Sequence, residues 1–195
     1  MGLSLVTGPT LEPISLGEAK DHCKITSTDE DGLFTTYILA ARKFAEGYTK
    51  RAFLTQTWDY TIDYYWPHTV DWRTQIDLPL PPLQSVTSIT YVDANGSPQT
   101  LAGSQYVTRT DGPFGRVVPA YGVTWPDIRY QVAAITVRFV AGWVEGSVPD
   151  DIRHGLLTLV GHFNEHREAV NEGGMSEVPM TTDTLLSSYR SIRFP

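Results

Sequence analysis

The sequence has few of the features that mark disulfide-rich, metal-binding or membrane proteins. Cys23 is the single cysteine, so no disulfide can form within the chain and no site built from several thiolates is possible. We therefore expect folding in a reducing compartment. The chain has no run of eighteen apolar residues, and its first residues lack the basic and apolar regions of a secretion signal. These absences predict a soluble, unprocessed protein without a membrane partner.

Positive charge is also scarce. The formal net charge is −7, and lysine and arginine are not clustered anywhere in the 195 residues. Proteins that bind the phosphate backbone of nucleic acids need such clusters to displace counterions. The acidic balance excludes a broad DNA-binding surface, and it is compatible either with simple solubility or with a lumen through which DNA slides.

Catalytic motifs are almost absent. The chain contains no G-x-S-x-G, no P-loop and no G-x-G-x-x-G. The one candidate is the H-x-x-E-H pattern of His162, Glu165 and His166, which places two imidazoles one helical turn apart, where they could share a zinc ion. A catalytic zinc needs a third protein ligand and an open position, and no second helical motif supplies that ligand. A zinc-dependent hydrolase is the alternative hypothesis, and we expect no enzyme, no metal and no cofactor.

The N-terminal quarter shows helical signals. Ser15 and Glu18 have capping-box spacing, which predicts a short helix over 16–23. Ser27 and Glu30 have the same spacing and predict a longer helix over 29–50. The apolar stripe expected on that helix comprises Leu33, Tyr37, Ala41, Phe44 and Tyr48, widened by Phe34 and Ile38.

After Arg51 the apolar period changes from about 3.6 residues to two, which is typical of a half-buried strand at 58–64. Further strands are predicted at 106–109, 116–118 and 134–141. Three prolines between 78 and 83 make that stretch an edge or a connector. The alternating segment 86–92 is followed by a turn at 93–96, which predicts a hairpin.

The chain then returns to helix. Pro149 suits a first helical turn, and an apolar stripe follows it, which predicts a helix at about 149–169 that packs on the helix at 29–50. Residues 171–179 are typical of a flexible linker, and the segment beyond it can form only two helical turns before a basic and aromatic end. Such a tail is expected to become ordered against another molecule.

These patterns predict an α+β protein whose helical core carries an inserted antiparallel β unit and a C-terminal tail. We expect the N-terminal helical part at 1–54, the β unit at 55–145, the core helix at 146–170, and the linker and tail at 171–195.

Five blocks of sequence occur in a recognisable order, at helix starts, at the switch from helix to strand and in the tail. They are residues 14–22, 48–58, 80–89, 148–153 and 185–190. Together they closely resemble the head-to-tail connector (adaptor, head completion) proteins of tailed bacteriophages and phage-like gene transfer agents. The resemblance covers nearly the whole chain.

The resemblance implies a structural virion protein, made in the bacterial cytoplasm, that acts at the interface of head and tail. Its copies would form a ring, dodecameric in the particle, beneath the portal protein. The ring would extend the DNA channel toward a stopper or tail-proximal connector protein, and DNA would pass through the lumen without specific binding.

The resemblance also implies that the C-terminal tail is the portal-binding arm. The physical character of the tail fits this role, because it offers apolar anchors and two arginines for charge-assisted contacts. The expected portal-binding residues are Leu185, Leu186, Tyr189, Arg190, Ile192, Arg193 and Phe194.

Overall fold

The computed structural model describes residues 1–64, 75–167 and 180–191. The chain forms two compact units. A β unit comprises Met1–Pro9 and Thr55–Trp143, and a helical unit comprises Thr10–Leu54 and Val144–Pro195. The helices and antiparallel sheets of these units confirm the predicted α+β class.

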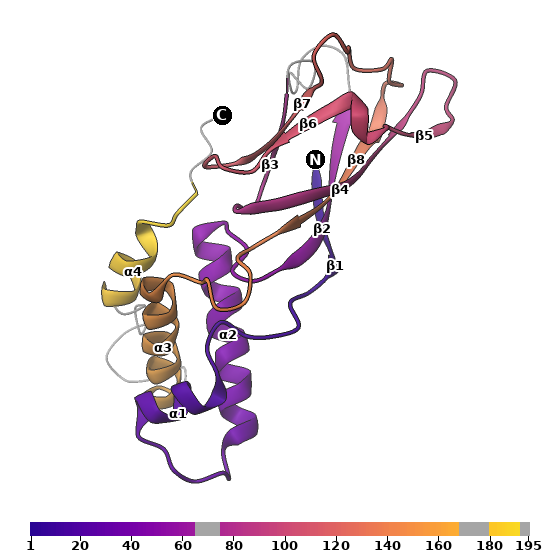
Figure 1. Ribbon diagram of the computed structural model, residues 1–195. Helices are drawn as coiled ribbons and strands as arrows, with labels where there is room; N and C mark the ends of the chain where they lie inside the picture. The colour runs from indigo at the N-terminus through magenta and orange to yellow at the C-terminus, as the bar shows by residue number, and fades with distance from the viewer. Residues whose placement is uncertain (65–74, 168–179, 192–195) are drawn as a thin grey trace. The chain divides into compact units, whose positions relative to one another are not determined.

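Four α-helices make up the described part of the helical unit (Figure 1). They are α1 (Leu16–Cys23), α2 (Asp31–Thr49), α3 (Asp150–Glu165) and α4 (Met180–Ser187). The capping box at the start of α1 is confirmed, since Ser15 Oγ accepts from the Glu18 N–H at 3.1 Å and the Glu18 carboxylate accepts from the Ser15 N–H at 2.7 Å. Both N–H groups would otherwise lack partners at the helix start. Lys24 ends the helix in a left-handed conformation, with a φ of 56°.

The predicted second capping box is wrong. The Ser27 hydroxyl is used locally instead, donating to the Asp29 carboxylate at 2.7 Å and accepting from the Asp29 N–H at 3.2 Å. Helix α2 therefore begins at Asp31 behind Glu30, whose side chain makes no capping hydrogen bond. A serine hydroxyl that bonds two residues ahead competes with the cap, and here the local turn prevails.

Helices α2 and α3 pack against each other, as predicted. Their contact buries small and apolar side chains of both helices, and the rings of Tyr37 and Phe163 lie 6.1 Å apart. The buried apolar residues are Phe34, Ile38, Ala41 and Ala45 on α2 and Ile152, Leu156, Leu159 and Val160 on α3. The buried face of α2 is thus rotated by part of a turn from the predicted apolar stripe. Phe44, which was predicted to lie in that stripe, is 40% exposed.

A buried arginine connects the two ends of this part of the chain. The Arg42 guanidinium, 6% exposed, donates to both oxygens of Glu12 at 2.7 and 3.2 Å and to Glu46 at 2.8 Å. The other Glu46 oxygen accepts from the Phe53 N–H at 2.8 Å. The network therefore fixes the segment before α1 and the segment after α2 onto the middle of α2. Bidentate pairing makes it directional as well as attractive.

We expect the Arg42→Ala variant to lose about 3 kcal/mol of unfolding free energy, because two carboxylates are left in a partly buried site without their cation. Urea denaturation followed by circular dichroism measures this loss. Lys43→Ala, at the exposed neighbouring position, is the matched control and should change the unfolding free energy by less than about 0.5 kcal/mol. Equal losses in the two variants would contradict a structural role for the Arg42 network.

The β unit contains two antiparallel sheets. The first has the order β1-β2-β8-β4-β5 and the second has the order β3-β7-β6. The strands are β1 (Gly2–Thr7), β2 (Gln56–Tyr64), β3 (Ile76–Leu78), β4 (Leu83–Val92), β5 (Pro98–Thr100), β6 (Tyr106–Arg109), β7 (Gly115–Pro119) and β8 (Gln131–Ala141). Strand β1 was not predicted from the sequence, and neither was the short β3.

The long central strands β2, β8 and β4 separate a buried face from a polar face. Tyr60 and Ile62 of β2 pair with Val137 and Ile135 of β8, and all four side chains are buried. On the opposite face Asp59 pairs with Arg138, whose guanidinium donates two hydrogen bonds of 2.8 Å to the carboxylate. This alternation is the period of two that the sequence shows after Arg51.

The predicted hairpin is confirmed between β4 and β5. The Asp93 N–H donates to the Ser97 carbonyl at 2.9 Å, and the Asp93 carboxylate accepts from the Asn95 and Ser97 N–H groups. Gly96 has a φ of 89°, which glycine tolerates best. The proline-rich stretch connects β3 at the edge of one sheet to β4 in the interior of the other, in agreement with its prediction as a connector.

Candidate protein-interaction surface

Helix α4 packs beside α3 within the helical unit (Figure 1). Leu186 is fully buried there, and a Cβ placed on Gly155 of α3 would lie 3.4 Å from Leu186 Cδ2. A Cβ there would be in ordinary van der Waals contact with Leu186, so the two helices lie close together at this point. The Ser191 N–H donates to the Thr49 carbonyl at 2.8 Å, which fastens the chain beyond α4 to the end of α2.

Polar contacts add to this packing. Tyr48 Oη lies 2.5 Å from the Asp183 carboxylate, to which it donates. That hydrogen bond raises the pKa of the Tyr48 hydroxyl, since it is lost when the hydroxyl ionises. Arg51 Nε donates to the Tyr189 carbonyl, and the Arg190 guanidinium lies 5.6 Å from the centre of the Tyr48 ring. The described residues of the tail up to Arg190 are thus held by α2 and by the residues just after it.

The predicted portal-binding residues fall into three groups. Leu186 lies in the core of the helical unit, Leu185 and Tyr189 are half-buried, and Arg190 is exposed. The remaining three, Ile192, Arg193 and Phe194, lie outside the described residues. Leu185, Tyr189 and Arg190, which are close together in the sequence, therefore reach the surface, whereas Leu186 faces inward.

A small groove of about 280 Å³ opens between α2 and α4. Its lining comprises Phe44, Tyr48, Thr182, Asp183 and Leu186. Phe44 is largely accessible, and the buried Thr182 hydroxyl has no hydrogen-bond partner in the described structure. A buried hydroxyl without a partner costs free energy, so α4 is held in this position chiefly by Leu186 and the polar contacts around Tyr48.

The histidine motif does not form a metal site in the described structure. The rings of His162 and His166 lie 4.6 Å apart, and His166 Nδ1 lies 3.2 Å from the His162 carbonyl. Within 1–64, 75–167 and 180–191, no group of three or more histidine, cysteine, aspartate or glutamate side chains gathers to hold a metal ion. Nothing in the described geometry supports the zinc-hydrolase alternative, because the third ligand of a catalytic zinc is not supplied.

Cys23 is not prepared for nucleophilic chemistry. Burial, followed by the negative charge of Glu165, raises the pKa of the Cys23 thiol above its usual value. A raised pKa lowers the fraction of reactive thiolate. The Cys23 thiol is half-buried at the end of α1.

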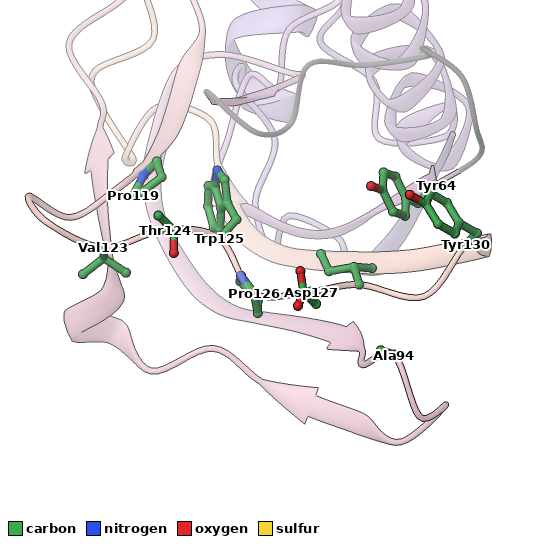
Figure 2. Close-up of a pocket in the computed structure, with 10 residues that line it drawn as sticks. Tyr64, Ala94, Pro119, Val123, Thr124, Trp125, Pro126, Asp127 and Tyr130 are labelled. Atoms are coloured by element: carbon green, nitrogen blue, oxygen red, sulfur yellow. The ribbon is translucent and has the colours of Figure 1, made fainter.

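The β unit carries a second, larger groove of about 660 Å³ (Figure 2). The figure shows Tyr64 and Tyr130 side by side at one end, and their rings stack at 4.6 Å with an interplanar angle of 15°. The lining is Tyr64, Ala94, Pro119, Val123, Thr124, Trp125, Pro126, Asp127, Ile128 and Tyr130. Among the described residues, this lining has one carboxylate and two tyrosines and no histidine, lysine or cysteine.

Neither this groove nor the exposed strand β1 was predicted. The alternation of Leu3 and Leu5 with Ser4 was a signal for β1, although a six-residue strand gives little periodicity to detect. The stacking of Tyr64 on Tyr130 joins residues distant in the sequence, and single-sequence patterns carry no information on such pairs. No helix in the described part of the chain is long and apolar enough to cross a membrane.

Residues 13–96 match the model of a family described as "Phage gp6-like head-tail connector protein". The match includes α1, α2 and the β4 hairpin turn. It confirms the resemblance to head-to-tail connector proteins that the sequence blocks predict. No curated protein matches the sequence.

Solved structures from gene transfer agent particles share the fold of the whole chain. One chain from "Virion of native gene transfer agent (GTA) particle" is 23% identical with a TM-score of 0.78, and one from "Neck of native GTA particle computed with C12 symmetry" is 22% identical with a TM-score of 0.77. A chain from "Neck of empty GTA particle computed with C6 symmetry" is 23% identical with a TM-score of 0.77. Each match covers 100% of this chain and 98% of the other, so both units are present in the relatives.

We expect the Leu186→Ala variant to lose about 2–3 kcal/mol of unfolding free energy, because a fully buried leucine leaves a cavity between α3 and α4. The matched control is Leu39→Ala, since Leu39 is 37% exposed on α2. Chemical denaturation should show a loss below about 1 kcal/mol for the control. Similar small losses in both variants would mean that α4 is not packed in solution as it is here.

We expect the helical unit to lose stability as the pH falls below about 6.5, the ordinary pKa of histidine. Burial, followed by the charge of His166, lowers the pKa of His162 in the folded protein. The unfolded chain then binds the proton more tightly, so stability is present above the ordinary pKa and is lost as the pH falls through the folded pKa. Melting temperatures at pH 7.5 and 5.5 measure the effect, and His162→Gln should show a smaller difference. An unchanged difference would assign the acid sensitivity to other groups.

Proposed function

We propose that this protein is a structural head-to-tail connector of a phage or phage-like particle. Its copies form a ring under the portal, extend the DNA channel and join the head to a stopper or tail-proximal protein. The observation that carries the proposal is the match of residues 13–96 to the gp6-like head-tail connector family. The likeness of the complete fold to chains from gene transfer agent particles supports it.

A ring of identical copies is supported by the symmetry of the similar structures, which are necks computed with C12 and C6 symmetry. Twelve copies in the particle is the number we propose. A ring of this kind requires head-to-tail contacts, in which each copy uses two different surfaces. The chain offers separate candidate surfaces on its helical unit and on its β unit.

The charge of the chain fits a channel wall better than a DNA clamp. A net charge of −7 does not favour lasting contacts with phosphates. DNA moves through a lumen more easily when the wall of the lumen does not bind it. We therefore propose passage of DNA without specific binding, and no catalytic step, cofactor or metal.

We propose that the C-terminal tail binds the portal. Tyr189 and Arg190 follow α4 at the surface, and Arg190 can make charge-assisted contacts with a partner. Leu186 has a different part in this proposal, since it holds α4 on the helical unit while the residues after α4 reach the portal. Ile192, Arg193 and Phe194 complete the proposed arm.

The test is light scattering and electron microscopy of the protein mixed with its portal. We expect a ring of this protein on the portal, and we expect binding to be lost when the chain is truncated after Ser191 and carries Arg190→Glu. This variant retains α4 and Leu186, so the helical unit should keep its circular dichroism spectrum and melting temperature.

The matched control is Arg129→Glu, which reverses the charge of an exposed arginine of the β unit that lies outside β1 and β6. It should bind the portal as the unmodified chain does. A truncated variant that binds with unchanged affinity would overturn the portal arm, and a native chain that neither binds the portal nor enters particles would overturn the connector function.

A further inference from the structure

The two sheets of the β unit have four edge strands among the described residues, namely β1, β5, β3 and β6. An edge strand presents unpaired N–H and C=O groups on which another chain can form a further strand. Proteins protect such edges with short strands, prolines, charges or burial. The four edges differ sharply in this protection.

Strands β5 and β3 are protected. Each is three residues long. Strand β5 begins with Pro98, which has no N–H to donate. Strand β3 has its two apolar side chains, Ile76 and Leu78, fully inside the unit, and Pro79 follows directly.

Strand β1 is much less protected, because its one protective feature is an irregularity in its pairing with β2 between Leu5 and Thr7. All six residues from Gly2 to Thr7 are exposed, and the strand contains no charge and no proline. Leu3 and Leu5 remain 40% and 51% exposed. A long, uncharged and apolar edge of this kind is a site for strand addition.

The apolar face of the large sheet continues onto β1 and is left uncovered there. Leu3 pairs with Tyr60 and Leu5 pairs with Trp58, so both leucines lie on the face that buries Tyr60 and Ile62. The buried Nε1–H of Trp58 has no acceptor in the described structure. In the described part of the chain, the apolar face therefore ends at β1 on exposed leucines.

Strand β6 is the second weakly protected edge. It spans Tyr106–Arg109, its one partner among the described strands is β7, and Val107 is 54% exposed. Its one charged residue, Arg109, already has a partner, because Arg109 Nε donates to the Asp111 carboxylate at 2.8 Å. The addition of a strand at this edge would not require an unpaired charge to be buried.

We propose that β1 of one copy pairs with the β6 edge of the next copy, so that the sheets of neighbouring subunits join. The four residues of β6 fit within the six of β1, and the uncharged β1 brings no like charge against Arg109. Two different edges make a head-to-tail contact, which can close into a ring, whereas pairing of β1 with β1 would stop at a two-fold dimer. The inference rests on the proposed ring function and names the surface that builds the ring.

Cysteine cross-linking tests the contact. In a Cys23→Ser background, Ser4→Cys places one thiol on β1 and Thr108→Cys places one on β6. The two single variants are mixed, as concentrated free protein and in assembled particles, and treated with a short bismaleimide. A covalent dimer between the two different variants is expected. Dimers in the Ser4→Cys sample alone would show β1–β1 pairing and overturn the proposal, and the absence of a mixed dimer in both preparations would also overturn it.

A charge on β1 provides a second measurement. Leu5→Lys should abolish ring formation in electron micrographs, while Val132→Lys, at a position of β8 that is 62% exposed, should leave rings intact. The melting temperatures of both variants establish that they fold. Rings that persist in Leu5→Lys would overturn the β1 contact and leave the connector function standing, whereas native protein that never forms rings, alone or on the portal, would remove the function itself.

Discussion

The helical unit depends on the pairing of Arg42 with Glu12 and Glu46. The chain passes between the two units three times, after Pro9, after Leu54 and after Trp143. Glu12 lies just beyond the first passage, and Phe53, which donates to Glu46, lies just before the second. The buried Arg42 guanidinium thus holds, on α2, the chain segments next to two of these three passages. An arginine can do this because its planar fork of donors binds two carboxylates at once.

The β unit is organised by a different constraint. Its long central strands β2, β8 and β4 pair with a neighbouring strand on both sides. Unpaired backbone groups are therefore confined to the edge strands of the two sheets. The two edges of the large sheet differ in their protection. Pro98 blocks pairing at one edge, whereas β1 at the other edge has no charge and no proline. A weakly protected edge of this kind can pair with a strand of a neighbouring copy.

The two proposed surfaces belong to different units, so their effects can be separated. The tail near Arg190 is carried by the helical unit, and β1 and β6 are carried by the β unit. A connector needs this division, since attachment to the portal and contact between neighbours in the ring are distinct tasks. The family match extends over α1, α2 and the β4 hairpin turn and so includes parts of both units.

The sequence by itself determined the local structure. The Ser15 capping box, the hairpin turn at Asp93 and the period of two along β2 depend on residues within a few positions of one another, and each is present. The second capping box failed because Ser27 had a nearer partner in Asp29. Tertiary structure alone decided that Leu186 is buried while Tyr189 and Arg190 reach the surface, that Phe44 is exposed, and that β1 is an edge. Burial and edge position depend on which segments far apart in the chain come together, and the local spacing of apolar residues does not contain that information.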